Sequence, residues 1–441
     1  SGTATVTLSF AAWKEGQVAA TTHSVQVLPA KPGPKAEPVA ENLIGTLVHP
    51  DRTSTVDTLK FSADGKQLFT TGYPSGIVQV WDVTQRQELR RLDTATRGSP
   101  YEQLLTRDWK TLYVPVGAVK TRTIEKEGKS AVRIEYSGSI RVWDMTSGEE
   151  KASLQTADGH APLASALSPD GAYLVCSELS SYDAGDSQLK GVTNVWNLKT
   201  GGKHKVSDGY VHPCFGPDGK VFALRALVLT AAVNTSAIQM FDTATGKVLA
   251  RLDCPEKERY FSVPEFSPDG SVLAFGLGGK KGGPREVWFR DAKTLEDRGQ
   301  FLADGSADGI GFGGADFTPD GKYYVILGVK DKIVLWEVSR QKVAREFAID
   351  ANVWRFAVSR DCHTLAVPWV PRAKLDGEAV SSPDPRDYPQ PRITLFDLAG
   401  KAPPRSLIAP HGFVGAVAFS PDGKTLAFGT SGGVRLFDLT K

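Results

Sequence analysis

The sequence contains few of the residues that carry redox and metal chemistry. Only 4 of its 441 residues are cysteines, and none of them forms a Cys-x-x-Cys pair. The 7 histidines occur singly, without the spacing that would place two imidazoles on one metal ion. Structural zinc and haem attachment depend on such clusters, so neither is predicted. We expect buried thiols, and the alternative is a disulfide between Cys176 and Cys214.

Long hydrophobic runs and an excess of one charge are also absent. The longest apolar run, residues 221–233, is interrupted by Arg225 and is shorter than the roughly 20 residues that a membrane helix needs. Lysine and arginine total 52 against 50 aspartates and glutamates, which leaves no large basic field to attract a phosphate backbone. We therefore expect neither direct membrane insertion nor a nucleic acid partner.

A short turn phrase recurs eight times along the chain. Each copy has an apolar residue, a small or hydroxyl residue, a variable residue and an aspartate, and glycine follows in most copies. Serine, proline and glycine suit successive positions of a tight turn between two strands, so the phrase indicates turn chemistry and not catalysis. The turn aspartates are Asp64, Asp108, Asp170, Asp218, Asp269, Asp320, Asp361 and Asp422.

A second phrase, with a hydrophobic, an aromatic and a polar or acidic residue, follows each turn phrase. It is Val-Trp-Asp at residues 80–82 and 142–144, and related forms occur in the other repeats. Its aromatic residue is expected to pack between neighbouring sheets. The turn aspartates lie 41 to 62 residues apart, near or above the ~40 to 45 residues of a four-stranded blade. The sequence therefore predicts an all-β, eight-bladed β-propeller.

The two ends of the repeat region predict how the ring closes. The last repeat stops near Asp438 after three strands, and residues 43–48 form an isolated strand ahead of the first repeat. Pairing of these two segments would complete the last blade and remove two exposed sheet edges. We therefore predict a propeller that is closed by its N-terminal strand.

Residues 43–441, with their Ser-Pro-Asp-Gly and Val-Trp-Asp phrases, resemble a WD-repeat β-propeller of bacterial type. The resemblance implies a scaffold that binds proteins or peptides. One departure concerns the Gly-His pair of the family, which survives only at Gly159-His160, with a reversed pair at His411-Gly412. The blades of this chain are therefore expected to be held by packing more than by the family's buried hydrogen-bond network.

The N-terminal region differs from the repeats. Residues 1–30 hold two alternating apolar runs, which predict a β-strand pair, and residues 31–42 form a proline-rich linker. Two strands alone are marginally stable in water. The pair either packs on the propeller or is the tail of a preceding immunoglobulin-like domain, and we favour the second. The chain begins with Ser1-Gly2, so we expect a module of a larger bacterial protein, in the cell envelope in preference to the cytoplasm.

Three insertions are expected on one face of the propeller, where the loops between second and third strands emerge in this family. They span residues 119–136, 180–191 and 370–392. Variable loops on a rigid scaffold are where recognition is usually placed, so the insertions predict a binding surface. The alternative is that they are solvated loops without a partner.

Candidate binding residues follow from aligning the first strand of each repeat by its turn phrase. The position nearest that face holds Asp57, Tyr101, Leu163, Val211, Ser262, Gly313, Trp354 and Gly415. Tyrosine, tryptophan and arginine dominate binding hot spots. We therefore predict partner contacts from Asp57, Tyr101, Trp354 and the adjacent Arg355, together with Tyr182 of the second insertion. The alternative for Trp354 is packing between blades.

Two motifs that resemble catalytic sites are better explained by turns. Residues 429–433 match the Gly-x-Ser-x-Gly string of a nucleophile elbow, but that motif needs a following helix, and residues 434–439 are predicted as a strand. Residues 276–284 are glycine-rich, yet they lack the following helix and the Gly-Lys-Ser/Thr ending of a phosphate loop. No catalytic residue is therefore predicted.

One segment has the donor pattern of an ion site. Asp304, Ser306 and Asp308 alternate like the oxygen donors of a calcium loop, but its twelfth position would be Ala315. We expect no cofactor and no metal site, with calcium as the alternative.

The sequence favours a non-catalytic, monomeric scaffold module that binds a protein or peptide through its insertion-bearing face. The alternative is a ligand-binding or enzymatic propeller with a site at the central channel, which converging carboxylates or histidines would favour. A structural spacer within a cell-envelope protein is a third hypothesis, which a smooth polar rim would favour.

Overall fold

A computed structural model gives the structure of the chain. It describes residues 4–14, 17–27, 42–50, 54–94, 103–126, 129–157, 159–183, 188–208, 211–229, 234–255, 259–278, 285–303, 314–329, 332–349, 351–353, 355–371, 392–408 and 414–440. The chain divides into two compact units, Ser1–Val39 and Ala40–Lys441. Within the described ranges all elements are strands, and no helix there could cross a membrane.

The first unit contains a single antiparallel pair. Strand β1 (Ala4–Lys14) pairs with β2 (Gln17–Val27), from Ala4 opposite Val27 to Lys14 opposite Gln17. The alternating apolar runs of this region therefore form two strands.

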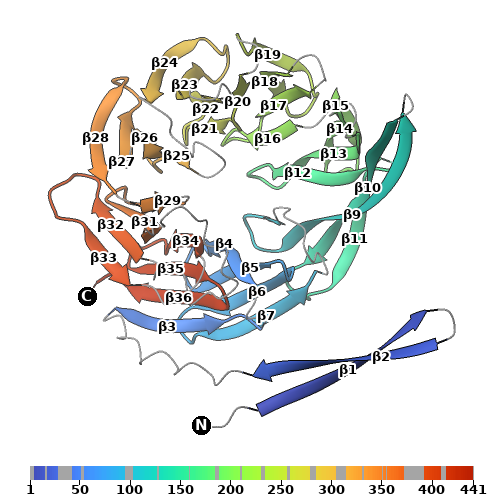
Figure 1. Ribbon diagram of the computed structural model, residues 1–441. Coiled ribbons are helices and arrows are strands. Elements are labelled where there is room, and N and C mark those ends of the chain that lie inside the picture. Colours follow the sequence, from blue (N-terminus) through green and yellow to red (C-terminus); the bar gives the residue numbers. More distant parts are fainter. Residues whose placement is uncertain are drawn as a thin grey trace. The chain divides into compact units, whose positions relative to one another are not determined.

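The described residues of the second unit form seven antiparallel sheets arranged in a ring (Figure 1), and the eight-stranded sheet holds two blades, so we number eight blades. Blade 1 contains β4 (Thr55–Phe61), β5 (Gln67–Tyr73), β6 (Ile77–Asp82) and β7 (Gln87–Asp93). Blade 2 contains β8 (Leu104–Leu105), β9 (Thr111–Lys126), β10 (Lys129–Asp144) and β11 (Glu150–Gln155). Blade 3 contains β12 (Ala161–Leu167), β13 (Tyr173–Asp183), β14 (Gln188–Asn197) and β15 (Lys203–Asp208). Blade 4 contains β16 (Val211–Phe215), β17 (Val221–Leu229), β18 (Asn234–Asp242) and β19 (Val248–Asp253).

The other four blades follow the same order, with the first strand of two of them divided into short pieces. Blade 5 contains β20 (Tyr260–Phe261), β21 (Glu265–Phe266), β22 (Val272–Gly278), β23 (Arg285–Asp291) and β24 (Asp297–Ala303). Blade 6 contains β25 (Ala315–Phe317), β26 (Tyr323–Val329), β27 (Lys332–Glu337) and β28 (Lys342–Ala348). Blade 7 contains β29 (Ala351–Val353), β30 (Ala357–Val358), β31 (Thr364–Pro371), β32 (Arg392–Asp397) and β33 (Arg405–Ile408). Blade 8 contains β34 (Val414–Phe419), β35 (Thr425–Thr430), β36 (Gly433–Asp438) and β3 (Leu43–Val48).

Blade 8 confirms the predicted closure of the ring. Strand β3 pairs antiparallel with β36, from Leu43 opposite Phe437 to Val48 opposite Gly433. The N-terminal strand of the ring thereby completes the blade formed by its last three strands, as Figure 1 shows.

Hydrophobic packing between blades forms the core. Eight clusters of buried side chains are present, and each joins two consecutive blades, including blades 8 and 1. The aromatic residues of the second phrase lie in these interfaces as predicted. Trp81 of blade 1 packs against Leu47 and Leu436 of blade 8, and Trp336 of blade 6 stacks on Phe289 of blade 5 with ring centroids 5.8 Å apart.

The recurring aspartates stabilise the turns between the first and second strands. In blade 1, the Ser62 hydroxyl donates to Asp64 Oδ1 at 2.6 Å and the Lys66 amide donates to the same oxygen at 3.0 Å. The following position has a left-handed backbone, with φ of 73° at Gly65, 62° at Trp109 and 57° at Cys362. Glycine occupies this position in most repeats because it adopts positive φ without a steric penalty. All four cysteines are free thiols.

Replacing Leu47 with alanine tests the closure of the ring. The Leu47 side chain is 1% exposed, and its loss leaves a cavity between blades 8 and 1. We expect Leu47→Ala to lower the free energy of unfolding by about 2–5 kcal/mol, measured by denaturant unfolding. Thr46→Ala, at an exposed position of the same strand, is the control and should change it by less than about 0.5 kcal/mol. Equal effects of the two substitutions would contradict this role of β3.

Candidate functional site

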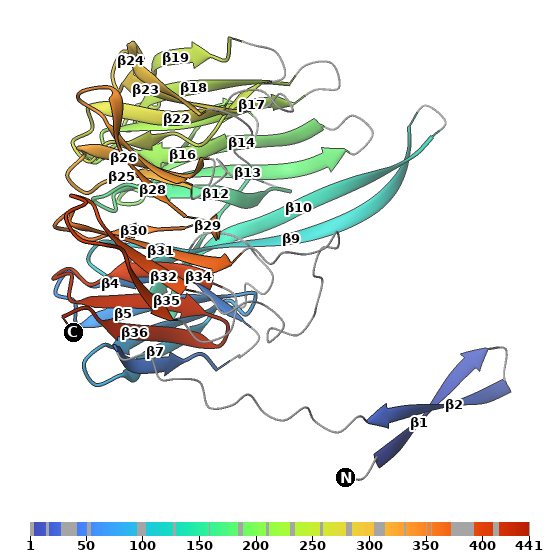
Figure 2. The same cartoon turned by 60° about the vertical axis from the view of Figure 1, so that its left-hand side comes forward.

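The predicted insertions of blades 2 and 3 form one continuous β-structure. Strands β9 and β10 pair along their whole length, and β10 also pairs with β13 through Arg133–Asp183, Ile134–Tyr182 and Glu135–Ser181. Blades 2 and 3 therefore share a single eight-stranded sheet. We name its projecting part the raised sheet: residues 119–126 of β9, 129–136 of β10, 181–183 of β13 and 188–190 of β14. Figure 2 shows the β9–β10 hairpin extending beyond the neighbouring strands, with β10 between β9 and β13.

One face of the raised sheet is apolar and aromatic. Val119 lies opposite Tyr136, and Ile134 lies opposite Tyr182. Side chains that are opposite, or two positions apart on one strand, share a face of a sheet, so these four residues gather on the same side with Val132. Val119 is 60% exposed and Val132 is 42% exposed. This face is therefore a solvent-accessible apolar surface, and it contains the predicted binding residue Tyr182.

The opposite face of the raised sheet carries charged side chains, with more basic than acidic groups, together with Ile124, which lies opposite Ala131. Lys120 lies opposite Glu135, and Arg122 lies opposite Arg133. An ion pair of 3.1 Å joins Arg122 to Glu135. A cavity of about 390 Å³ opens beside these strands, lined by Lys120, Arg133, Glu135, Tyr136, Ser137, Gly159, Ser180 and Ser181.

The aligned first-strand position coincides with an interruption of the inner strand in several blades. Asp57, Leu163 and Gly415 are bulged residues without an opposite partner in β5, β13 and β35. Ser262 falls in the gap that divides the first strand of blade 5. A bulged residue has no opposite partner in the neighbouring strand. At this level of the ring, the first strands therefore carry residues that do not take part in strand pairing.

Two of the predicted binding residues come together at this level. Arg355 of blade 7 reaches past blade 8, and its Nη1 donates to the main-chain oxygen of Asp57 in blade 1 at 3.4 Å. Blade 8 has Gly415 at the equivalent position, where a side chain would overlap the carbonyl oxygen of Val56. Tyr101 and Trp354 lie outside the described residues.

The carboxylate of Asp57 is half-buried. The Thr71 hydroxyl donates to its Oδ1 at 2.7 Å. Burial raises the pKa of Asp57, while the Thr71 hydrogen bond and the charge of Arg355 act in the opposite direction. Asp57 is therefore held in place by its own blade and by blade 7.

A second group of ionisable side chains, which the sequence analysis did not identify, comes from the first strands of blades 4, 5 and 6. Cys214, Glu265 and Asp316 each precede the apolar residue of a turn phrase, so they hold equivalent positions in β16, β21 and β25. The Tyr324 hydroxyl donates to Glu265 Oε2 at 3.0 Å. Comparing this position across the repeats would have revealed the group.

The surroundings favour the protonated forms of these residues. Burial raises the pKa of Glu265 well above its usual value, and the charge of Asp316 raises it further. Burial also raises the pKa of Asp316, and it raises the pKa of the Cys214 thiol to about 12. In its protonated form, each of these groups can donate a hydrogen bond.

The described residues contain no group of three His, Cys, Asp or Glu side chains that could hold a metal ion. The segment from Asp304 to Asp308, with the donor pattern of a calcium loop, lies outside the described residues, as does most of the third insertion, 372–391.

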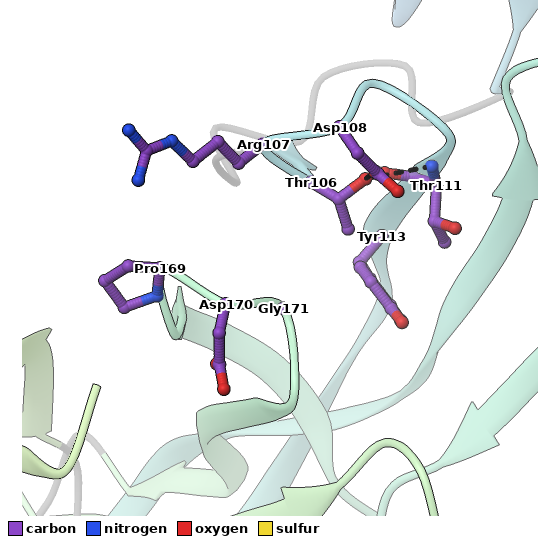
Figure 3. A pocket seen from close by; sticks show the side chains of 8 residues that line it. All are labelled: Thr106, Arg107, Asp108, Thr111, Tyr113, Pro169, Asp170 and Gly171. Carbon is purple, nitrogen blue, oxygen red and sulfur yellow. Dashed lines mark hydrogen bonds between the residues drawn. The ribbon is translucent and has the colours of Figure 1, made fainter. Parts of the chain in front are cut away.

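The opposite face of the ring has a larger cavity, of about 620 Å³, between the turns of blades 2 and 3 (Figure 3). Three of its polar residues form hydrogen bonds with one another within the turn of blade 2. Thr106 Oγ1 donates to Asp108 Oδ1 at 2.7 Å, and the Thr111 amide donates to Thr106 Oγ1 at 3.0 Å. In Figure 3 the Arg107 side chain extends away from Tyr113. We therefore place the stronger candidate site on the insertion-bearing face.

The ring of antiparallel blades defines the chain as a β-propeller. Residues 41–82 and 402–438 match the family described as WD domain, G-beta repeat. These segments include the closing strand β3, most of blade 1, and blade 8. The chain is therefore a β-propeller that contains WD repeats in these two segments.

The chain is similar to solved structures of low sequence identity, and the first two of the following share its fold. The C-terminal WD40 domain of Sif2 has a TM-score of 0.55 and 12% identity, covering 90% of this chain and 99% of that chain. The Dos1 propeller has a TM-score of 0.50 and 16% identity, with coverages of 71% and 76%. Kuenenia stuttgartiensis hydrazine synthase has a TM-score of 0.45 and 17% identity, with coverages of 92% and 98%. No curated protein matches the sequence.

The raised pKa of Glu265 makes stability depend on pH. Because this pKa is higher in the folded than in the unfolded chain, the folded protein retains a proton that the unfolded chain loses above its ordinary value of 4.5. Stability is therefore lost as pH rises from that value through the pKa of the folded state. Glutamine cannot ionise, and its oxygen can still accept the hydrogen bond from Tyr324. We expect Glu265→Gln to raise the melting temperature by a few degrees at pH 8 and to change it little at pH 4.

Differential scanning calorimetry across this pH range provides the measurement. Glu149→Gln, at an exposed position, is the control and should leave the melting temperature unchanged at both values. A Glu265→Gln variant that is destabilised equally at pH 4 and pH 8 would show that Glu265 is needed as a carboxylate.

Proposed function

We propose that this protein is a scaffold that binds a protein or peptide partner on its insertion-bearing face. WD-repeat propellers generally serve protein interaction. The observation that carries the proposal is the exposed apolar face of the raised sheet, formed by Val119, Val132, Ile134, Tyr136 and Tyr182.

The physical argument concerns where apolar surface is exposed. Exposed apolar patches with polar surroundings mark interaction sites, and tyrosine is enriched in binding hot spots. Two tyrosines and three aliphatic or β-branched side chains occupy one face here, while basic residues occupy the other. The β9–β10 hairpin that carries most of these residues extends beyond the neighbouring strands (Figure 2). Asp57 and Arg355 add a polar pair on the ring, and Tyr101 and Trp354 remain predicted contacts.

An aspartate on the apolar face tests the proposal. Val119→Asp places a charge at an exposed position, so the fold should persist while burial of that position against a partner becomes costly. We expect the affinity for the physiological partner to fall at least about tenfold, or about 1.4 kcal/mol. The partner is first isolated with the tagged wild-type protein and identified by mass spectrometry, and its affinity is then measured by calorimetry.

Leu249→Asp supplies the matched control. Leu249 is 50% exposed on the outer strand β19 of blade 4, away from the insertions. The partner should bind this variant as it binds the wild type. Binding that survives Val119→Asp and is lost in Leu249→Asp would move the interaction surface away from the raised sheet.

A second candidate function is ligand binding at the centre of the ring. It is favoured by the convergence of Cys214, Glu265 and Asp316 from three consecutive blades. The scaffold proposal predicts no change in melting temperature on adding millimolar calcium. A rise that is present in the wild type and absent in Asp316→Asn would favour this second function, because a ligand stabilises the state that binds it. A rise in melting temperature that persists in the Asp316→Asn variant would instead favour calcium binding by the segment at Asp304.

A further inference from the structure

The edge of β9 on the side away from β10 carries main-chain groups that no described strand pairs. On the side away from β10, β9 pairs with β8 only through Leu104–Tyr113 and Leu105–Leu112. It then continues to Lys126, paired with β10 alone among the described residues. An unpaired edge of this kind is the element to which an extended peptide can add as another strand.

The direction of these main-chain groups follows from two observations near the base of β9. The Thr111 carbonyl oxygen accepts from the Thr106 amide at 2.9 Å, on the side of β8. Pro115 has no amide hydrogen to give to β10. Main-chain groups alternate between the two sides of an antiparallel strand. The β9–β10 pairing has no register shift, so Val119, Thr121 and Thr123 also direct their amides and carbonyls away from β10.

The side chains along this edge indicate which composition a peptide strand needs in order to pair with β9. Val119, Thr121 and Thr123 lie on the apolar face of the raised sheet, and Lys120 and Arg122 lie on the opposite face. All five are exposed. Opposite charges on directly opposed positions stabilise a strand pair, as do apolar or β-branched side chains opposite one another.

We propose that a partner's extended segment adds, as a further strand of the raised sheet, to the edge of β9 that no described strand pairs. In that segment, acidic residues alternate with β-branched or aromatic residues. The acids face Lys120 and Arg122, and the apolar side chains extend the surface of Val119 and Tyr182. This inference rests on the proposed function and specifies the partner of the same face.

The charges argue against a second copy of this chain as the occupant. Two β9 edges brought together would bring Lys120 and Arg122 of one copy beside the same residues of the other, and like charges opposite one another destabilise a strand pair. Basic residues on an edge strand are one means by which proteins prevent self-association. The same residues attract an acidic segment.

Binding of a designed peptide tests the proposal. The probe is a fluorescein-labelled peptide, Thr-Glu-Val-Glu-Ile-Glu-Val, titrated against the full chain and followed by fluorescence anisotropy. We expect saturable binding that weakens at least about tenfold when lysine replaces the three glutamates. Two copies N-methylated on alternate residues each block one edge of the peptide, so one should bind and the other should not. Equal binding of both methylated copies, or of the lysine peptide, would overturn the proposal.

Two substitutions at one position isolate the edge. Thr121→Pro removes the outward amide hydrogen without touching the bonds to β10, as Pro115 already does lower in the same strand. Thr121→Val keeps that amide. We expect the peptide to bind Thr121→Pro at least about tenfold more weakly than the wild type, and to bind Thr121→Val within about twofold of it. Equal binding by the two variants would overturn strand addition.

Hydrogen exchange on the unmodified protein tests the same edge of β9 and does not require the proline variant to fold. On adding the peptide, the amides of Val119, Thr121 and Thr123 should gain protection, and those of Lys120 and Arg122 should change little. Protection in the opposite pattern, or none at saturating peptide, would contradict the edge pairing.

The outcomes separate this inference from the proposed function. A physiological partner that no longer binds Val119→Asp but still binds Thr121→Pro would contradict strand addition and would still support the scaffold function. A partner that still binds both variants would contradict both the strand-addition inference and the proposed scaffold function. A dimer in sedimentation that Thr121→Pro dissolves would replace the acidic segment with a second copy of the chain.

Discussion

The structure depends on hydrophobic packing between neighbouring blades. A single four-stranded blade has two apolar faces and cannot cover them alone, so each face is buried against the next blade in the ring. The eight interfaces hold the buried core residues, and the last one joins the two ends of the repeat region through Leu47, Trp81 and Leu436. Without that interface, blades 1 and 8 would each expose an apolar face. Closure by β3 is therefore a requirement of the fold and not an addition to it.

A closed ring also makes the raised sheet possible. A two-stranded hairpin is marginally stable in water by itself. Strands β9 and β10 are continuous with blade 2, and β10 gains a further partner in β13 of blade 3. The projecting strands are therefore supported at their base by two blades and along one side by a third strand. On their other side, no described strand pairs with the projecting part of β9, so the same feature combines an apolar face with main-chain groups that no described strand uses.

The ring centre shows a second consequence of the repeat. The turn phrases hold equivalent positions in every blade, so residues next to them also meet around the ring. Cys214, Glu265 and Asp316 come together for this reason. Burial of carboxylates is costly, and the Tyr324 hydroxyl offsets part of that cost at Glu265. Asp57 and Gly415 also hold equivalent positions in their blades, and both are bulged residues at the level of Arg355.

The local part of the fold could be predicted with little ambiguity. Turn phrases specify left-handed positions through Gly65 and its equivalents, and aromatic residues such as Trp81 specify buried third strands, because both depend on short-range chemistry. The closing strand was predictable since the last repeat lacks one strand. The site was only partly predictable. Alignment placed Asp57 at the level where Arg355 is found, and the insertions marked residues 119–136 and 180–191.

The sequence by itself determined the number of repeats, their turn chemistry, the closing segment and the positions of the insertions. These features depend on residues close together in the chain. Only the tertiary structure decided that Ile134 meets Tyr182, that Arg355 reaches Asp57 past Gly415, and that Glu265 lies close enough to Asp316 for the two charges to interact. The reason is physical: these contacts depend on how neighbouring blades are angled and spaced around the ring, which is set by packing among residues distant in sequence.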